Sequence, residues 1–135
     1  MPPRQRPRSP QAGPHRGRQG EHLAAAYLEQ QGYEILARNW RAPQVRNELD
    51  LVARDGQTIV FVEVKSARTS RFGDPLAWVT PRKQAAIIRA AQAYVLGHDL
   101  SDCELRFDVV AVGPPRAGER PLTHLVGAFT ADSDP

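Results

Sequence analysis

The sequence predicts a single α/β domain in which a mixed sheet of four or five strands packs against flanking helices. Two observations predict this fold class. Two apolar runs flank Asp55 and Gly56, which is typical of a β-hairpin, and segments whose apolar residues recur at helical spacing lie before and after that hairpin. A length of 135 residues favours one domain with a core of its own.

The domain is expected to span residues 19–130. Residues 1–18 are rich in Pro, Arg, Gln and Gly, so we expect a disordered tail there and another at 131–135. Of the 18 Lys and Arg residues, five precede Gly20, which leaves 13 against 15 Asp and Glu in the remainder. The high pI therefore comes largely from the tail and does not by itself indicate a nucleic-acid-binding domain.

The elements are expected in the order α-β-β-β-α-β-β. A first helix is predicted over residues 20–31, because its apolar residues form one stripe and Gly32 follows as a stop. Thr80 is a typical N-cap, Pro81 suits the first helical position, and the second helix should end near Leu96. Strands are predicted over 33–40, 48–54, 58–65, 105–112 and 122–129, and 66–79 should be a long irregular segment.

Charged residues interrupt the two hairpin strands, where a buried sheet favours Val or Ile. If Asp55 and Gly56 form a two-residue type I′ turn, Glu48 faces Glu63 and Asp50 lies on the diagonal, all on one face of the sheet. The opposite face is wholly apolar and should be covered by a helix. Its residues are Leu49, Leu51, Ala53, Val60, Val62 and Val64.

Such a cluster of carboxylates requires a compensating cation, because opposed like charges destabilise a sheet and half-buried carboxylates are costly unless paired. Lys65 supplies one charge, which does not balance three carboxylates. A divalent ion with oxygen ligands, Mg²⁺ or Mn²⁺, is the natural remedy, and it would bring phosphoryl-transfer chemistry. An isolated Glu-x-Lys on a strand is usually a solvated pair, but the preceding Asp50 strand, the tight turn and Glu21 on the first helix favour a functional site here.

The order of Asp50 and then Glu63-Val64-Lys65 resembles the PD-(D/E)xK nuclease signature, and Glu21 strengthens a likeness to the Holliday-junction-resolvase branch. More closely, the chain resembles the YraN family of predicted bacterial nucleases. The matching segments are GEHLAAAYLEQQGYEILARNW, NELDLVARDGQTIVFVEVKSA, FGDPLAWVTPRKQAAIIRAAQAYV, LRFDVVAV and THLVGAF.

The resemblance implies a restriction-endonuclease-like core and a set of site residues. Asp50 and Glu63 would ligate Mg²⁺, assisted by the Val64 carbonyl, and Lys65 would be the catalytic lysine. Glu21 would be an outer ligand or position a water. Glu48 fits the family motif Gly-Glu-Ile-Asp, here Asn-Glu-Leu-Asp, and is counted with the metal ligands. Ala67 stands where the family often has an arginine, which puts one phosphate contact in doubt.

Four further residues are candidates for nucleic-acid contacts: Arg68 and Arg71 in the 66–79 segment, and Lys83 and Gln84 at the start of the second helix. Arg89 is expected on a plain solvent face, and Arg106 and Asp108 should form a salt bridge. Tyr27, Trp40 and Trp78 are expected in the core.

The sequence therefore predicts a Mg²⁺-dependent endonuclease-like protein that acts on DNA, with branched structures as one candidate substrate. Two other interpretations stay open: a nucleic-acid-binding module with a metal site but little catalysis, and a protein-interaction domain. A lone Cys103 and the lack of a long apolar run indicate a reduced, cytoplasmic setting without a membrane partner. A homodimer is suggested only by analogy with resolvases.

Overall fold

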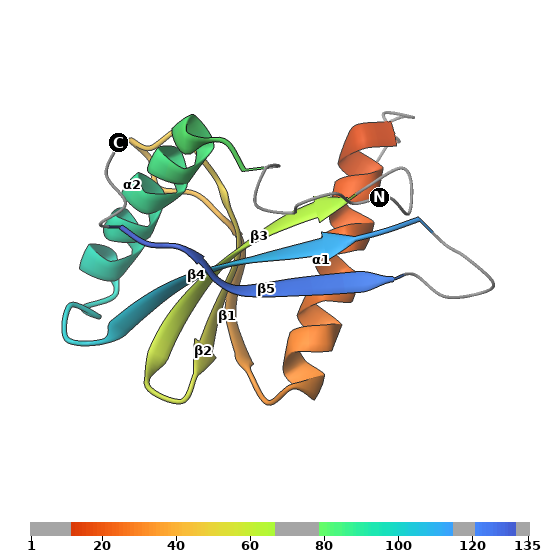
Figure 1. The fold of residues 1–135 in the computed structure, drawn as a ribbon. Coiled ribbons are helices and arrows are strands. Elements are labelled where there is room, and N and C mark those ends of the chain that lie inside the picture. Colours follow the sequence, from red (N-terminus) through yellow and green to blue (C-terminus); the bar gives the residue numbers. More distant parts are fainter. Residues whose placement is uncertain (1–11, 67–78, 115–120, 132–135) are drawn as a thin grey trace, which may run out of the picture.

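The computed structural model describes residues 12–66, 79–114 and 121–131, with the backbone alone for 12–17 (Figure 1). The order of elements is the predicted one. They are α1 (Ala12–Gln30), β1 (Glu34–Trp40), β2 (Leu49–Asp55), β3 (Thr58–Ser66), α2 (Pro81–Gly97), β4 (Glu104–Val112) and β5 (Leu122–Phe129).

The five strands form one mixed sheet in the order β1-β2-β3-β4-β5, so every strand lies beside its neighbour in sequence. Three of the four pairings are antiparallel, and β3 and β4 run parallel. A parallel pair requires a crossover, and α2 supplies it (Figure 1). The α/β class with a mixed sheet is confirmed.

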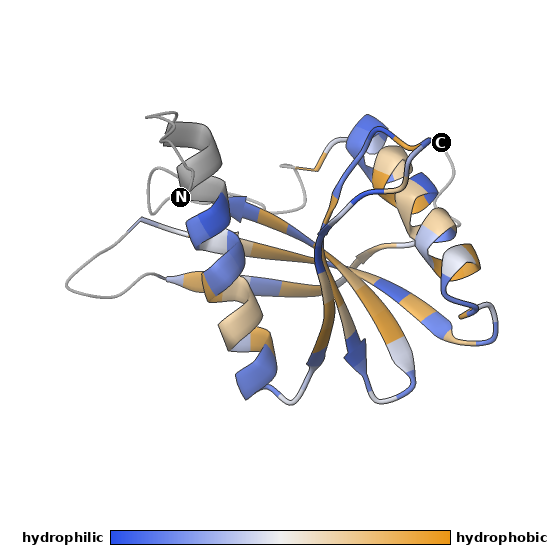
Figure 2. Ribbon diagram, turned by 180° about the vertical axis from the view of Figure 1, so that it is seen from behind, coloured by the Kyte–Doolittle hydropathy of each residue, from blue (hydrophilic) through white to orange (hydrophobic). Residues whose placement is uncertain are grey.

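The two helices cover opposite faces of this sheet (Figures 1 and 2). Ala24, Ala25 and Leu28 of α1 pack against one face, and the stripe of α2 that includes Ile87 and Tyr94 packs against the other. Because alternate residues of each strand point to opposite faces, each central strand contributes to both cores. Because helices cover both faces of the sheet, functional side chains can reach solvent mainly at the ends and edges of the strands.

The predicted apolar face of the hairpin is covered by α1, with one exception. Leu51, Ala53, Val60 and Val62 belong to the α1 core, and Val64 packs against it. Leu49 instead joins the α2 core; it lies two residues before Leu51, where the described pairing between β2 and β3 begins.

The hairpin turn differs from the predicted one by a single position. Asp55 pairs with Thr58, so Gly56 and Gln57 are the central residues. Gly56 has a φ of 64° and Gln57 has no positive φ, which is typical of a type II′ turn rather than type I′. The pairing therefore moves by two residues, so that Val52 faces Phe61, while the side chains of the paired residues from Leu51 to Val62 keep their predicted faces.

One predicted helix start is wrong and the other is confirmed. α1 begins at Ala12, eight residues before the predicted start, so the part of the expected tail from 12 to 18 is helical; extending an existing helix adds a hydrogen bond for each residue fixed. In α2 the N-cap is confirmed, since Thr80 Oγ1 accepts from Lys83 N at 3.1 Å. In the described residues, neither helix has the length and apolar character needed to span a membrane.

Candidate functional site

Two carboxylates lie side by side on the central hairpin. Leu51 pairs with Val62, so the next residues, Asp50 and Glu63, are opposed. The prediction that Glu48 faces Glu63 is wrong, because the turn sits one residue later and shifts the pairing. Asp50 Oδ2 accepts a hydrogen bond from Val64 N at 2.8 Å, so the Asp50 side chain is held against the backbone of β3.

The electrostatics of this pair are unfavourable for two ionised groups. Only 5% of Glu63 is exposed, and Asp50 is half-buried. Burial and then the negative charge of Glu63 raise the pKa of Asp50 from 3.8 to about 7, although the Val64 hydrogen bond and the charge of Lys83 oppose the rise. Near neutral pH a substantial fraction of Asp50 is therefore protonated, and an added cation would favour its ionised form.

Two lysines approach the pair from one side. Lys65 Nζ lies 3.6 Å and Lys83 Nζ 3.9 Å from the same oxygen, Glu63 Oε2. Lys83 also donates to Asn47 Oδ1 at 2.9 Å, which fixes its direction. Over the described ranges no cation lies within ion-pair distance of Asp50. The positive charges of the two lysines thus lie beside Glu63 rather than beside Asp50.

Glu21 of α1 completes a row of carboxylates. Gly20 lies against β3, where a Cβ would collide with the Ser66 hydroxyl, so glycine permits a close approach of helix and strand. Burial raises the pKa of Glu21, the hydrogen bond from Asn39 lowers it, and the charges of Asp50 and Glu48 raise it further. Glu21 therefore lies close enough to Asp50 and Glu48 for their charges to interact, and its role as an outer ligand stays a prediction.

Other predicted site residues lie differently. Glu48 Oε1 is 3.9 Å from Arg41 Nη2, and 38% of the Glu48 side chain is exposed. Gln84 Nε2 donates to the Val79 carbonyl at 2.9 Å, a contact that closes the first turn of α2. Arg68 and Arg71 lie outside the described residues, as does Trp78. The role of the Val64 carbonyl as a ligand stays a prediction.

Two asparagines that the sequence did not single out hold the charged groups. Asn47 accepts from Lys83, and Asn39 Nδ2 donates to Glu21 Oε1 at 2.7 Å. Asn39 has a φ of 49°, a left-handed conformation in which asparagine is enriched. An asparagine near the end of a predicted strand was the only available signal for it.

The donor chemistry of the pair fits a hard divalent cation. Asp50 and Glu63 offer carboxylate oxygens, and Mg²⁺ commonly uses one or two carboxylates and retains several waters. Across residues 12–66, 79–114 and 121–131, however, no three His, Cys, Asp or Glu side chains are grouped closely enough to hold a metal ion by themselves. A bound ion would therefore depend on water or substrate oxygens for its remaining ligands.

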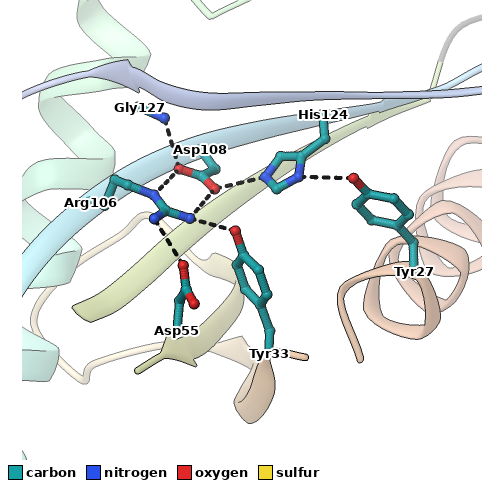
Figure 3. Close-up of polar contacts among 7 residues, drawn as sticks. All are labelled: Tyr27, Tyr33, Asp55, Arg106, Asp108, His124 and Gly127. Carbon is teal, nitrogen blue, oxygen red and sulfur yellow. Dashed lines mark hydrogen bonds and ion pairs between the residues drawn. The ribbon is translucent and has the colours of Figure 1, made fainter. Parts of the chain in front are cut away.

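A second buried carboxylate, Asp108 on β4, has quite different surroundings (Figure 3). It is fully buried and accepts from Arg106 Nε at 2.9 Å, His124 Nε2 at 2.7 Å and Gly127 N at 3.0 Å. Burial raises its pKa, but these hydrogen bonds and the Arg106 charge outweigh burial and leave the pKa below 3.8. The predicted Arg106–Asp108 salt bridge is confirmed.

This Asp108 cluster extends to three other elements. Arg106 also contacts Asp55 at 3.1 Å and the Tyr33 hydroxyl at 2.6 Å (Figure 3). Tyr27, predicted as core, packs against the α1 core and has its hydroxyl 3.3 Å from His124 Nδ1. Trp40 packs edge-on against Tyr94 at 5.0 Å, as a core residue should. The cluster thus connects β2, β4, β5 and α1 through hydrogen bonds, and its buried carboxylate is compensated without a ligand.

Comparison with known proteins identifies the family. Residues 20–112, which include Glu21, Asp50, Glu63 and Lys65, match the sequence model described as uncharacterised protein family UPF0102. The chain belongs to the UPF0102 family. The resemblance to YraN-like proteins is thereby confirmed.

Relatives named as UPF0102 proteins cover most of the chain. One from Chlorobium chlorochromatii is 52% identical over 118 residues, covering 84% of this chain and 89% of the relative. One from Beutenbergia cavernae is 48% identical over 111 residues, covering 82% and 92%. A third, from Geobacter sulfurreducens, is 45% identical over 113 residues, covering 84% and 87%. These UPF0102 names state no activity.

Proposed function

We propose that this UPF0102 protein is a metal-dependent endonuclease that hydrolyses phosphodiester bonds in DNA. The observation that carries the proposal is the opposed pair Asp50 and Glu63, with Lys65 and Lys83 beside Glu63 only. Carboxylates that are buried or half-buried, like-charged and incompletely compensated are typical of sites that bind a cation or a substrate. Branched DNA is the substrate class to test first, because the sequence resembles the resolvase branch.

The fold supports a restriction-endonuclease-like core. The site lies on a β-hairpin at the centre of a mixed sheet, and a helix covers each face. The first helix contributes Glu21, and the hairpin contributes Asp50, Glu63 and Lys65. The PD-(D/E)xK resemblance implies that the site residues come from these same elements. Fold alone does not determine function, so the proposed activity depends on the site residues.

Each residue has a role in the proposed hydrolysis. Asp50 and Glu63 would hold Mg²⁺ or Mn²⁺, and a bound ion of this kind polarises a phosphoryl oxygen and lowers the pKa of a water. Lys65, 3.6 Å from Glu63, is placed to orient the attacking water or to stabilise charge that develops on the phosphate. Val64 N fixes the Asp50 carboxylate, and Asn39 fixes Glu21.

A nucleic-acid-binding module without turnover is the second candidate. Its support is that Lys65 and Lys83 already neutralise Glu63, and that a pKa of about 7 lets Asp50 carry a proton, so the site can be balanced without a metal. A protein-interaction domain with merely solvated carboxylates is less well supported, because only 5% of Glu63 is exposed.

Cleavage of a labelled panel tests the proposal. Single-stranded, duplex, flap and four-way-junction DNA would be incubated with Mg²⁺, Mn²⁺ or EDTA, using the wild type, Lys65→Ala and the control Arg54→Ala. Arg54 lies opposite Ile59 at the hairpin end of β2, away from the carboxylate pair. We expect metal-dependent cutting that Lys65→Ala abolishes and Arg54→Ala preserves. Junction binding without cutting would favour the binding module, and neither binding nor cutting would overturn both candidates.

A further inference from the structure

A groove of about 440 Å³ runs beside the carboxylate pair, between α2 and the loop that joins β1 to β2. Two exposed arginines, Arg46 from the loop and Arg89 from the helix, project from its opposite walls. The residues that line it are Gln44, Val45, Arg46, Asn47, Ala86 and Arg89.

Both segments carry a net positive charge. α2 contains Arg82, Lys83 and Arg89 and no acidic residue, and the loop 41–48 contains two arginines and one acidic residue, Glu48, whose carboxylate lies 3.9 Å from Arg41. Arg82, Ala86 and Arg89 follow one another at helical spacing, so they lie along one side of α2. Arg89, expected on a plain solvent face, thus belongs to a basic groove, although the domain as a whole is slightly acidic.

Contacts connect the groove to the carboxylates. Asn47 lines the groove and binds Lys83 at 2.9 Å, and Lys83 lies 3.9 Å from Glu63. Through the described residues neither Arg46 nor Arg89 has an ion-pair partner, so both guanidinium groups are available to an anion. A ligand in this groove would therefore reach the carboxylate pair.

A smaller hollow of about 80 Å³ lies at the other end of the carboxylate row. Its lining combines Glu21 and its partner Asn39 with three basic side chains, Arg18, His22 and Arg38. The hollow adjoins the acidic row of Glu21, Asp50 and Glu63 at Glu21, whereas the groove adjoins it at Glu63, through Asn47 and Lys83. Basic side chains thus flank the acidic row on both sides.

We propose that one polynucleotide strand lies across this row, with its phosphates held by Arg46 and Arg89 on one side of the reacting bond and by Arg18 and Arg38 on the other. A strand of this kind must continue past the site in both directions, so the cut is internal and needs no free end. The internal cut rests on the proposed function, whereas binding of the phosphates by the four arginines can be tested without hydrolysis.

Binding in EDTA tests the path separately from hydrolysis. Fluorescence anisotropy of a labelled single-stranded oligonucleotide would compare the wild type, Arg46→Gln/Arg89→Gln, Arg18→Gln/Arg38→Gln and the control Arg54→Gln over a salt series. We expect each double variant to bind at least about threefold more weakly and to reduce the salt slope by about 0.7 for each phosphate that is no longer neutralised. Arg54→Gln, which lines neither recess, should bind as the wild type does.

A substrate without ends tests the internal cut. With Mg²⁺, a closed single-stranded circle should be linearised at a rate comparable with cutting of the linear strand. A circle that survives while the linear strand shortens from its ends would overturn the path through both recesses, and so would double variants that bind like Arg54→Gln.

The two proposals fail in different ways. Wild-type binding that depends on Arg46 and Arg89, without cutting in any metal, would retain the path and reject the hydrolysis. Metal-dependent cutting that both double variants perform normally, with unchanged binding, would retain the hydrolysis and reject the path. Melting temperatures of the two double variants, expected to equal that of the wild type because Arg18, Arg38, Arg46 and Arg89 are exposed, exclude misfolding as the cause.

Discussion

Asp50 and Asp108 are carboxylates of the same sheet with opposite surroundings. Asp108 is fully buried and has donors from Arg106, His124 and Gly127, so its pKa is lowered. Asp50 is half-buried and has one backbone donor and a like-charged neighbour, so its pKa is raised to about 7. Each carboxylate lies between two apolar residues of its strand, but only Asp108 is fully compensated.

The difference separates a structural carboxylate from a functional one. A buried polar group with a full set of partners contributes to a specific fold and needs nothing more. A carboxylate pair that lacks partners costs stability, and such a cost is typical of a site that binds a cation or substrate. The comparison yields predictions of opposite sign for two substitutions of the same kind.

The largest expected effect is that of Asp108→Asn. The amide cannot satisfy Arg106, His124 and the Gly127 N–H as an ionised carboxylate does, and breaking a buried ion pair costs about 3–5 kcal/mol. Urea denaturation at neutral pH measures the change. Asp55→Asn is the matched control, since Asp55 contacts the same arginine but is 45% exposed, and it should cost about 1 kcal/mol or less. Equal costs for the two variants would contradict the distinction.

Asp50→Asn should stabilise the protein in EDTA, by about 1–2 kcal/mol at pH 8, because it removes the repulsion from Glu63 and the cost of burying a charge. The amide oxygen can still accept from Val64 N. Chemical denaturation of both proteins under the same conditions measures the difference.

The same substitution has a distinct pH dependence. Because the folded pKa of Asp50 is raised, its favourable contribution is complete below about pH 4 and is lost as the pH rises to about 7. The advantage of Asp50→Asn should therefore grow across that window and then level off. Asp108, with a lowered pKa, contributes fully throughout the window and loses its contribution only at lower pH. An advantage that does not change between pH 4 and 7 would count against a raised pKa.

Metal binding sharpens the comparison further. Mg²⁺ at about ten times its dissociation constant should stabilise the wild type by about 1.4 kcal/mol, and Asp50→Asn should abolish this gain. Thermal melts with Mg²⁺ and with EDTA measure it, and Asp55→Asn should keep the gain because it leaves the carboxylate pair intact. If the wild type melts at the same temperature in both buffers, the carboxylate pair does not bind Mg²⁺; the structural role of Asp108 would be unaffected.

Local patterns were enough to predict the order of the elements and the N-cap at Thr80, because each depends on residues close in sequence. The hairpin was predicted, but its turn was misplaced, since Asp55-Gly56 and Gly56-Gln57 both offer a glycine with a positive φ. A shift of two residues preserves the faces, so Asp50 and Glu63 were correctly placed on one side although their partners were not.

Contacts between distant elements could not be predicted in the same way. Lys83 reaches Glu63 because α2 crosses from β3 to β4 and begins beside the site, and Asn39 meets Glu21 because α1 lies close to β3 at Gly20. Arg106 and Asp108 were paired from their spacing, but the participation of His124, Tyr33 and Asp55 depends on the sheet order.

The smallest expected effects concern the two tyrosines of the Asp108 cluster. The Tyr33 hydroxyl accepts from the charged Arg106 at 2.6 Å, whereas the Tyr27 hydroxyl lies 3.3 Å from His124 Nδ1. Hydrogen bonds to charged groups contribute more than neutral ones, so Tyr33→Phe should cost about 1–2 kcal/mol and Tyr27→Phe about 0.5 kcal/mol. Urea denaturation can resolve that ranking, and the reverse order would mean that His124, rather than Arg106, anchors the cluster. Neither substitution should alter the Mg²⁺-induced stabilisation, because neither side chain touches the carboxylate pair.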